Sequence, residues 1–180
     1  MLESLLKKYW NYDSFRPLQR EIIVSVMQGN DTLALLPTGG GKSICYQLPA
    51  LAKDGVCFVF SPLIALMKDQ VDALRANGIS ASYFNSSQDA TQQQEMLEEL
   101  RSGSLKLIYV APESIGLLNN HLQEIPVSLI AVDEAHCIST WGHDFRPAYT
   151  QLAYFKTSFP DANLIALTAT ADRATSADIK

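Results

Sequence analysis

Two adjacent acids and a nearby aromatic, basic segment carry the clearest chemistry in this chain. Asp133 and Glu134 come directly after the apolar run VSLIAV, at residues 127–132. The segment that follows contains Trp141, His143, Asp144, Phe145 and Arg146. Acids at the end of a buried strand can hold a metal ion, and aromatic and basic side chains can contact a nucleic acid. Their adjacency predicts that one site communicates with the other.

A second segment, PTGGGKS at residues 37–43, is typical of a phosphate-binding loop. Its glycines allow backbone amides to wrap around a phosphate chain, and Lys42 could reach the terminal phosphates. The strict pattern has glycine where this chain has Leu36, but an apolar run precedes the loop and a helix-forming segment follows it. The predicted nucleotide-binding residues here are Thr38, Gly39, Gly40, Gly41, Lys42 and Ser43.

A phosphate-binding loop also needs an acid to hold Mg²⁺ and a group to orient water. We expect Ser43 and Asp133 to bind Mg²⁺, and Glu134 to polarise the attacking water. An acid pair after a strand is often only a solvated helix start. Its combination with the glycine-rich loop about ninety residues earlier predicts a nucleotide site.

Short β-branched runs alternate with amphipathic segments, which is typical of a parallel sheet covered by helices. Helices are predicted over residues 2–10, 17–28, 42–52, 63–76, 89–101, 113–122 and 147–158 and in the C-terminal tail. Strands are predicted over residues 32–36, 56–60, 81–84, 105–110, 129–132 and 164–167. The expected fold class is α/β, with three layers, a mostly parallel sheet and helices on both faces.

Composition limits the classes of protein to which the chain can belong. Its 180 residues, 47% hydrophobic and 18% charged, predict one globular domain over residues 1–180. A net charge of −5 means that any contact with nucleic acid must be local. The three cysteines form no CxxC pair, which argues against a zinc site or disulfide framework built from this chain alone. No apolar run reaches membrane-spanning length, so we expect a soluble intracellular protein without a membrane partner.

Further motifs follow in a fixed order: FRPLQ at 15–19, SPLIALMKDQV at 61–71, YVAPE at 109–113, DEAHCISTWGHDFRPAY from 133, and ALTATA from 166. With PTGGGKS, they make the chain similar to the RecQ family of superfamily 2 helicases. The tetrad DEAH alone is ambiguous, because some RNA helicases share it. The combination of DEAHCIS with WGHDFRP is highly specific, and the resemblance covers essentially the whole chain.

The resemblance implies the first RecA-like P-loop lobe of a 3′→5′ ATP-dependent DNA helicase. Its cofactors would be ATP and Mg²⁺, and its partners would be single-stranded and duplex-junction DNA and a second RecA-like lobe. It would serve DNA repair and recombination in the cytoplasm or nucleoid, or in the nucleus of a eukaryote.

The resemblance also assigns residues to the adenine base. Tyr12 would stack on the base, Arg16 would belong to the same motif, and the Gln19 amide would match the donor and acceptor of the base edge. The family commonly has glycine at the position of Leu18. His136 would bridge the nucleotide and DNA sites, although it could instead be a structural histidine.

A second group of residues would contact DNA or couple it to ATP hydrolysis. They are Ser61, Lys68, Trp141, His143, Phe145, Arg146, Thr168 and Thr170. Trp141 and Phe145 could instead be core aromatics, but their position between Gly142 and Pro147 favours a loop.

No second lobe, zinc module or winged helix is recognisable after residue 171, so we expect half an active site. Alone, it should bind ATP–Mg²⁺ weakly and hydrolyse it slowly, and the ending DRATSADIK, without a helix stop signal, predicts an excised domain. Two other functions compete with this interpretation. One is a non-motor nucleotide-binding module or scaffold, and the other is an RNA-directed remodelling ATPase.

Overall fold

The computed structural model describes residues 2–15, 18–35, 43–61, 64–85, 88–111, 125–133, 159 and 162–168. Its helices are α1 (Leu2–Trp10), α2 (Gln19–Met27), α3 (Ile44–Ala52), α4 (Ile64–Ala76) and α5 (Ala90–Ser102). Its strands are β1 (Thr32–Leu35), β2 (Val56–Phe60), β3 (Ala81–Phe84), β4 (Leu107–Val110), β5 (Val127–Val132) and β6 (Asn163–Thr168). Each begins and ends within two residues of its predicted bounds. The helices predicted at 113–122, at 147–158 and in the tail lie outside the described residues.

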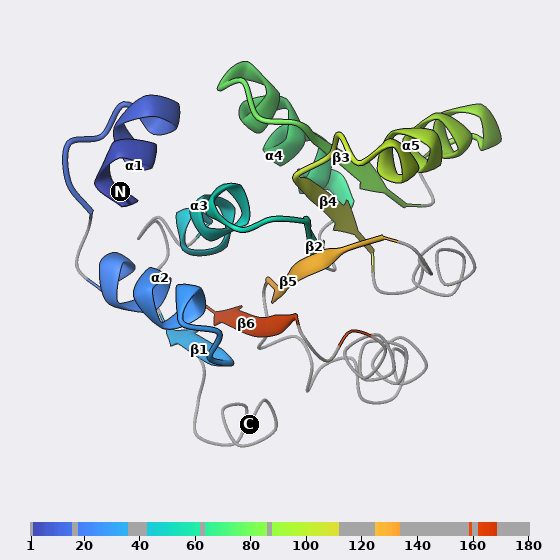
Figure 1. The fold of residues 1–180 in the computed structure, drawn as a ribbon. Coiled ribbons are helices and arrows are strands. Elements are labelled where there is room, and N and C mark those ends of the chain that lie inside the picture. The colour runs from blue at the N-terminus through green and yellow to red at the C-terminus, as the bar shows by residue number, and fades with distance from the viewer. Residues whose placement is uncertain are drawn as a thin grey trace.

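The strands form one six-stranded sheet in the order β1-β6-β5-β2-β4-β3 (Figure 1). Every pairing between them is parallel. The predicted α/β class is therefore confirmed. Because the strands are parallel, all of their carboxyl ends lie along the same edge of the sheet.

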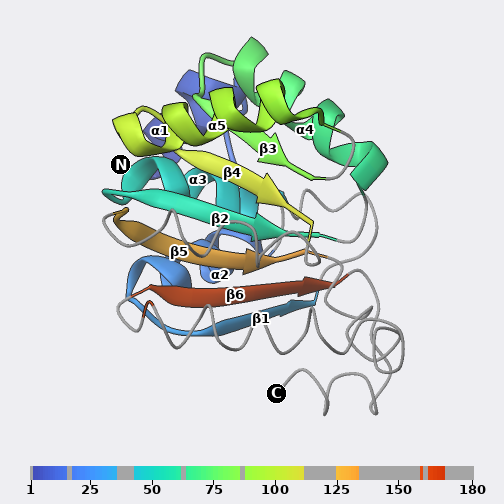
Figure 2. The same ribbon diagram turned by 90° about the vertical axis from the view of Figure 1, so that its right-hand side faces the viewer.

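Helices cover both faces of the sheet, as predicted. The core on one face joins the sheet to α2, α3 and α4, and the core on the other face joins it to α5. Alternate residues of β2 divide between the two cores, with Cys57 and Val59 in the first and Phe58 and Phe60 in the second. Figure 2 shows α5 in front of the sheet and the other helices behind it. Strands buried on both faces explain the apolar runs in the sequence.

A smaller cluster holds α1 against α2 and α3. Its buried members are Leu6 of α1, Ile23 of α2, and Ile44 and Leu48 of α3. The Arg20 Nε donates to the Glu3 carboxylate at 2.8 Å on the exposed side of the same junction. The N-terminal helix is thus packed onto the helix that begins after the phosphate-binding segment.

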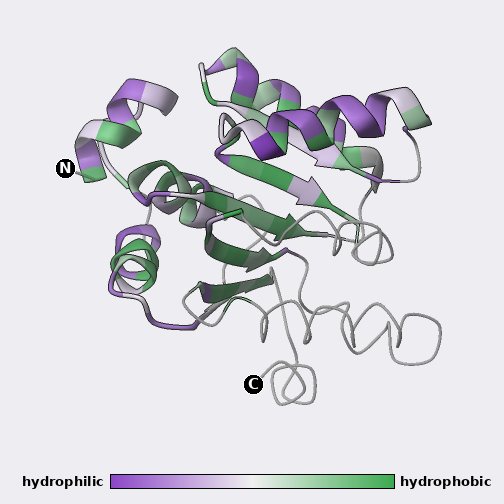
Figure 3. Cartoon of the chain, turned by 45° about the vertical axis from the view of Figure 1, so that its right-hand side comes forward, coloured by the Kyte–Doolittle hydropathy of each residue, from purple (hydrophilic) through white to green (hydrophobic). Residues whose placement is uncertain are grey.

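Apolar residues are concentrated in the strands, and polar residues lie on the outer helices (Figure 3). This distribution is that of a domain whose core is the sheet. Within the ranges that the structure describes, none of the helices combines the length and the apolar character needed to cross a membrane.

Two of the three cysteines are structural. Cys45 and Cys57 are buried and carry free thiols. Burial raises the pKa of Cys45 to about 12 and also raises the pKa of Cys57, so both thiols stay protonated at neutral pH. Cys137 lies outside the described residues.

The amino edge of the sheet is fixed by a buried amide. Asn163, the first residue of β6, donates from Nδ2 to the carbonyls of Val26 and Asn30, at 3.0 Å each. Its Oδ1 accepts from Lys53 Nζ at 2.6 Å. These bonds tie the end of α2 and the turn before β1 to the neighbouring strand. The position of β1, which leads into the phosphate-binding segment, is set by them.

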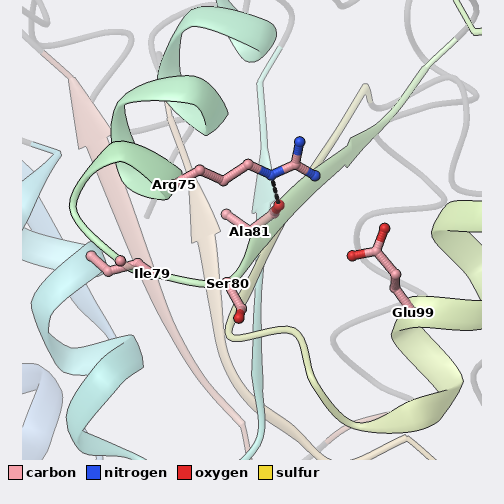
Figure 4. Close-up of a pocket in the computed structure, with 6 residues that line it drawn as sticks. Arg75, Ile79, Ser80, Ala81 and Glu99 are labelled. Carbon is pink, nitrogen blue, oxygen red and sulfur yellow. Dashed lines mark hydrogen bonds between the residues drawn. The ribbon is translucent and has the colours of Figure 1, made fainter.

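An open surface pocket of about 520 Å³ lies beside the start of the edge strand β3 (Figure 4). Arg75 Nε donates to the Ala81 carbonyl at 2.9 Å, and Gln88 Nε2 donates to the Tyr83 carbonyl at 2.8 Å. Successive carbonyls of a strand alternate in direction, and those of Ser80 and Phe84 face β4. The two capped carbonyls therefore face outward, and the side chains block addition of another strand.

Candidate nucleotide-binding site

Four neighbouring strands bring the predicted motifs to one edge of the sheet. In the order β1, β6, β5 and β2, the strands end at Leu35, Thr168, Val132 and Phe60. Leu35 is in register with Thr168, and Phe60 is in register with Val132. The glycine-rich segment follows β1 in sequence, and the acid pair follows β5. Open α/β sheets bind ligands at the carboxyl ends of their strands, so this edge is the candidate site.

Asp133 is positioned by the backbone of the sheet. Its amide N–H donates to the Phe60 carbonyl of β2 at 2.9 Å, which continues the β5–β2 pairing by one residue. Its side chain is partly buried. The carboxylate therefore sits where the sequence predicts it, at the end of a buried strand.

Ser43 lies at the other side of the candidate site, as the residue before α3. Its backbone carbonyl accepts from the amides of Tyr46 at 3.2 Å and Gln47 at 2.9 Å, in the first turn of the helix. Burial raises the pKa of Tyr46, and the Asp133 carboxylate raises it further because a negative charge disfavours a phenolate. Burial also raises the pKa of Tyr109, and the neighbouring Cys57 and Asp133 raise it further. Both tyrosines therefore feel the charge of Asp133, and Tyr46 follows Ser43 by one helical turn.

The available donors fit Mg²⁺. They are a carboxylate and a hydroxyl, both oxygen ligands, and Mg²⁺ is typically bound by one or two carboxylates together with phosphates and water. The described ranges contain no cluster of three or more histidine, cysteine, aspartate or glutamate side chains that could hold a metal ion. This donor set suits an ion that arrives with a nucleotide, rather than one enclosed by protein ligands alone.

The residues predicted to contact adenine differ in their exposure. Tyr12 is 50% exposed, so its ring is available for stacking. Gln19, the first residue of α2, is only 2% exposed. The Gln19 side chain is therefore almost closed off from solvent in this structure.

The structure describes three of the predicted DNA contacts, Ser61, Lys68 and Thr168. Ser61 follows β2 and is buried, with its amide donating to the Val110 carbonyl at 3.3 Å. Lys68 is exposed on α4, and its Nζ pairs with Asp72 at 2.8 Å. An exposed ion pair of this kind contributes little to the free energy of folding, so a DNA phosphate could replace Asp72 as the partner of Lys68. Thr168 ends β6, between the strands that lead to the glycine-rich segment and to Asp133.

The other predicted site residues lie outside the described residues, and their roles stay predictions. They are Arg16, Thr38, Gly39, Gly40, Gly41, Lys42, Glu134, His136, Trp141, His143, Phe145, Arg146 and Thr170.

Comparison with known proteins decides the family. Residues 16–179 match the family model described as DEAD/DEAH box helicase. The chain belongs to the DEAD/DEAH box helicase family.

Relatives of the chain within this family include RecQ helicases. An ATP-dependent DNA helicase RecQ of Haemophilus influenzae is 57% identical over 98% of this chain and 29% of its own length. One from Bacillus subtilis is 50% identical over 94% of this chain and 29% of its own length. The predicted similarity to RecQ helicases is confirmed. The chain spans less than a third of the length of these relatives.

A solved structure supports the fold independently of close sequence similarity. The crystal structure of the DUF1998 helicase MrfA bound to DNA superposes with a TM-score of 0.75 at 19% identity. The match covers 94% of this chain and 26% of that one. The two chains therefore share the fold of this domain although few of their residues are identical.

One departure from the RecQ pattern has a physical consequence. Leu18, where that pattern commonly has glycine, adopts a left-handed backbone with φ 72° and ψ −18° before α2. This conformation costs a non-glycine residue about 1–2 kcal/mol, whereas glycine adopts it freely. Leu18 is 54% exposed, so its side chain gains little from burial. Leu18 therefore holds a strained backbone that glycine would adopt without strain.

We predict that Leu18→Gly stabilises the domain by about 0.5–1 kcal/mol, because relief of strain exceeds the added entropy of the unfolded chain. Leu66→Gly is the matched control, since Leu66 is 50% exposed but lies within helix α4. It should destabilise by about 0.5–1 kcal/mol. Urea unfolding of both variants measures the two changes, and equal destabilisation would show that Leu18 is unstrained.

Three buried polar residues near the site were not among the residues predicted from the sequence. Tyr46 and Gln47 lie on α3, and Tyr109 lies on β4. The available signal was polar groups in otherwise apolar elements, since Tyr46 and Gln47 interrupt the run ICYQLPALA. Such groups need hydrogen-bond partners inside the protein.

Proposed function

We propose that this chain is the ATP-binding lobe of an ATP-dependent 3′→5′ DNA helicase of the RecQ type. The observation that supports the proposal is the strand order, in which only β6 separates β1, which leads into the glycine-rich segment, from β5, which Asp133 follows. The names of the relatives, which are ATP-dependent DNA helicases, supply the substrate class.

In this proposal, backbone amides of residues 38–42 hold the phosphates, and Lys42 neutralises their terminal charge. Ser43 and Asp133 hold Mg²⁺, which would supply positive charge against the developing charge on the phosphate oxygens. Glu134 orients the attacking water. Tyr12 stacks on adenine, and Arg16 and Gln19 complete its recognition.

The strand order supports communication between nucleotide and DNA. Strand β6 lies between β1 and β5, so Thr168 ends, and Thr170 follows, a strand that separates the two halves of the nucleotide site. The segment that begins at Asp133 continues in sequence to His136 and Trp141. We propose that DNA stacked on its aromatic residues shifts these neighbours and so promotes hydrolysis.

A second RecA-like lobe would complete the site. The relatives have more than two thirds of their length beyond the matched region, which is room for such a lobe. An arginine contributed across the interface can raise hydrolysis by about 10³–10⁵-fold in comparable enzymes. We therefore propose that residues 1–180 alone hydrolyse ATP slowly. The two-lobed protein would act in DNA repair and recombination, in the cytoplasm or nucleoid, or in a eukaryotic nucleus.

Lys42→Ala tests the nucleotide site. We predict that it weakens binding of a non-hydrolysable ATP analogue with Mg²⁺ by at least about tenfold, because phosphate charge loses its cation. Calorimetry on the 180-residue chain measures the affinity, with Lys8→Ala on exposed α1 as the control. Identical affinities for wild type and Lys42→Ala would contradict the proposed phosphate contact.

One relative favours a second candidate function. A putative ATP-dependent RNA helicase of Acanthamoeba polyphaga mimivirus is 43% identical over 99% of this chain and 33% of its own length. In this second candidate function, the ATP-binding lobe belongs to an ATPase that RNA stimulates. The two candidates differ in which nucleic acid stimulates ATP hydrolysis.

A further inference from the structure

One buried glutamine links three elements of the domain. Gln47 lies on α3 and is only 4% exposed. Its Nε2 donates to the Tyr109 hydroxyl of β4 at 2.9 Å and to the Gln70 Oε1 of α4 at 3.4 Å. The Tyr109 hydroxyl also bonds to the Tyr46 hydroxyl of α3 at 2.9 Å. A single side-chain amide thus joins the helix that follows the glycine-rich segment to the sheet and to a second helix.

Core packing alone does not require this amide. Helices α3 and α4 lie on the same face of the sheet (Figure 1), where Cys45, Ala50, Met67 and Val71 belong to one apolar core. A methionine in place of Gln47 would fill nearly the same volume without the cost of burying an amide. Both hydrogens of the amide nitrogen are used in bonds to other elements. The amide therefore fixes a direction between elements that apolar contacts would leave free.

The two bonds of this amide differ in length and burial. The bond to Tyr109 is short and buried, whereas the bond to Gln70 is longer and only partly buried. A short hydrogen bond in the low-dielectric interior is the stronger of the two. Gln47 is therefore held firmly to the sheet, and a small movement of α4 would change its bond to Gln70 first.

The α4 end of this connection lies beside a predicted DNA contact. Gln70 is two residues after Lys68 and two before Asp72, and these two side chains pair at 2.8 Å on the exposed surface of α4. A DNA phosphate that takes Lys68 from Asp72 would act on the same turns of the helix that carry Gln70.

The α3 end of the connection lies at the glycine-rich segment. The backbone amide of Gln47 donates to the carbonyl of Ser43 at 2.9 Å, in the first turn of α3. Ser43 is the last residue of PTGGGKS. The backbone of Gln47 thus holds the end of the phosphate-binding segment, while its side chain holds α4.

We propose that Gln47 is a positioning residue that connects α4 to the end of the glycine-rich segment, so that DNA and nucleotide strengthen each other's binding. This inference rests on the proposed function, in which ATP binds that segment and DNA contacts α4. Each ligand orders one end of the connection, so the second ligand has less to order. The effect is reciprocal, and one neutral hydrogen bond supports a factor of about three to ten.

The test measures the coupling between the two ligands in the two-lobed protein. The affinity for a single-stranded DNA oligonucleotide is measured with and without a saturating non-hydrolysable ATP analogue and Mg²⁺, and the ratio of the two affinities is the coupling factor. Gln70→Met keeps side-chain length and helix propensity but removes the acceptor for Gln47. It should lower the coupling factor by at least about threefold and leave the affinity for each ligand alone near wild type.

Gln70→Glu separates the hydrogen bond from other roles of this side chain. A carboxylate keeps an acceptor for the Gln47 amide. Its negative charge should weaken DNA binding equally with and without the analogue, so the coupling factor should stay near that of wild type. A side chain that matters only for stability would leave the coupling factor unchanged in both variants.

Gln93→Met on α5 is the matched control. Gln93 is also a partly buried helical glutamine, and its Nε2 donates to the Asn85 carbonyl at 3.2 Å, on the helix that covers the other face of the sheet. It should leave the coupling factor unchanged. Gln47→Met should lower the factor about as much as Gln70→Met, and the double variant no further, because all three remove one bond. If Gln47→Met does not fold, Gln70→Met still decides the question.

The outcomes separate the inference from the function on which it rests. A wild-type protein with the same DNA affinity in the presence and absence of the analogue would overturn the proposed coupling of ATP to DNA and the inference together. A wild-type coupling factor that Gln70→Met keeps in full would overturn the inference alone, as would an equal loss in Gln70→Glu or in Gln93→Met.

Discussion

Asp133→Asn is expected to lower DNA-stimulated ATP hydrolysis by about 10²–10³-fold in the two-lobed protein, the range for loss of one preorganised electrostatic group. The amide has nearly the shape of the carboxylate but no charge, so it binds Mg²⁺ far more weakly. The backbone bond from residue 133 to the Phe60 carbonyl involves no side-chain atom and should persist. Stability should therefore change little while steady-state hydrolysis collapses.

Asp54→Asn is the matched control for this prediction. Asp54 is exposed in the turn before β2, at the amino edge of the sheet, so it carries the same charge change at the opposite end. It should retain wild-type hydrolysis. If Asp133→Asn is folded and hydrolyses ATP at the wild-type rate, Asp133 is not the acid that holds the metal.

Trp141→Ala is expected to reduce the affinity for single-stranded DNA and its stimulation of hydrolysis by about 5- to 150-fold. This range corresponds to the roughly 1–3 kcal/mol lost with one stacking contact. Nucleotide affinity without DNA should stay near wild type, because the predicted phosphate contacts come from residues 38–43. The measurement is the rate of hydrolysis as a function of DNA concentration, with nucleotide affinity determined separately.

Trp141→Phe separates stacking from other roles of the tryptophan. Phenylalanine keeps an aromatic face, so most of the stimulation should return. A folded Trp141→Ala protein that loses nucleotide binding along with DNA stimulation would instead identify a structural tryptophan.

The elements of this fold were largely predictable from local pattern. Runs such as VCFVF at 56–60 and breakers such as Gly55 and Gly78 mark the strands and turns to within two residues. The order β1-β6-β5-β2-β4-β3 was not predictable in this way. Strands buried on both faces are similarly apolar, so the pattern does not say which pairs with which.

The candidate site also contains some features that the sequence predicted and others that it did not. Asp133 could be placed at a strand end because an acid directly after an apolar run marks the point where the chain leaves the core. The Tyr46–Tyr109 bond joins residues 63 positions apart, so the sequence did not show that these two polar groups are partners. The left-handed backbone at residue 18 could not be predicted from the leucine itself, because leucine rarely adopts that conformation. Hydrogen-bond partners that are far apart in sequence and strained backbone conformations can therefore be identified only from the three-dimensional structure.

The central claim is that this domain holds an ATP–Mg²⁺ site controlled by DNA. The most direct measurement is the steady-state rate of ATP hydrolysis by the two-lobed protein with single-stranded DNA, with RNA of the same length and sequence, and with neither. We predict that DNA stimulates hydrolysis at least about tenfold, because stacking of one base on an aromatic side chain contributes about 1–3 kcal/mol. RNA should stimulate hydrolysis little. Stronger stimulation by RNA would favour the RNA-directed ATPase, and equal rates under all three conditions would contradict the coupled motor.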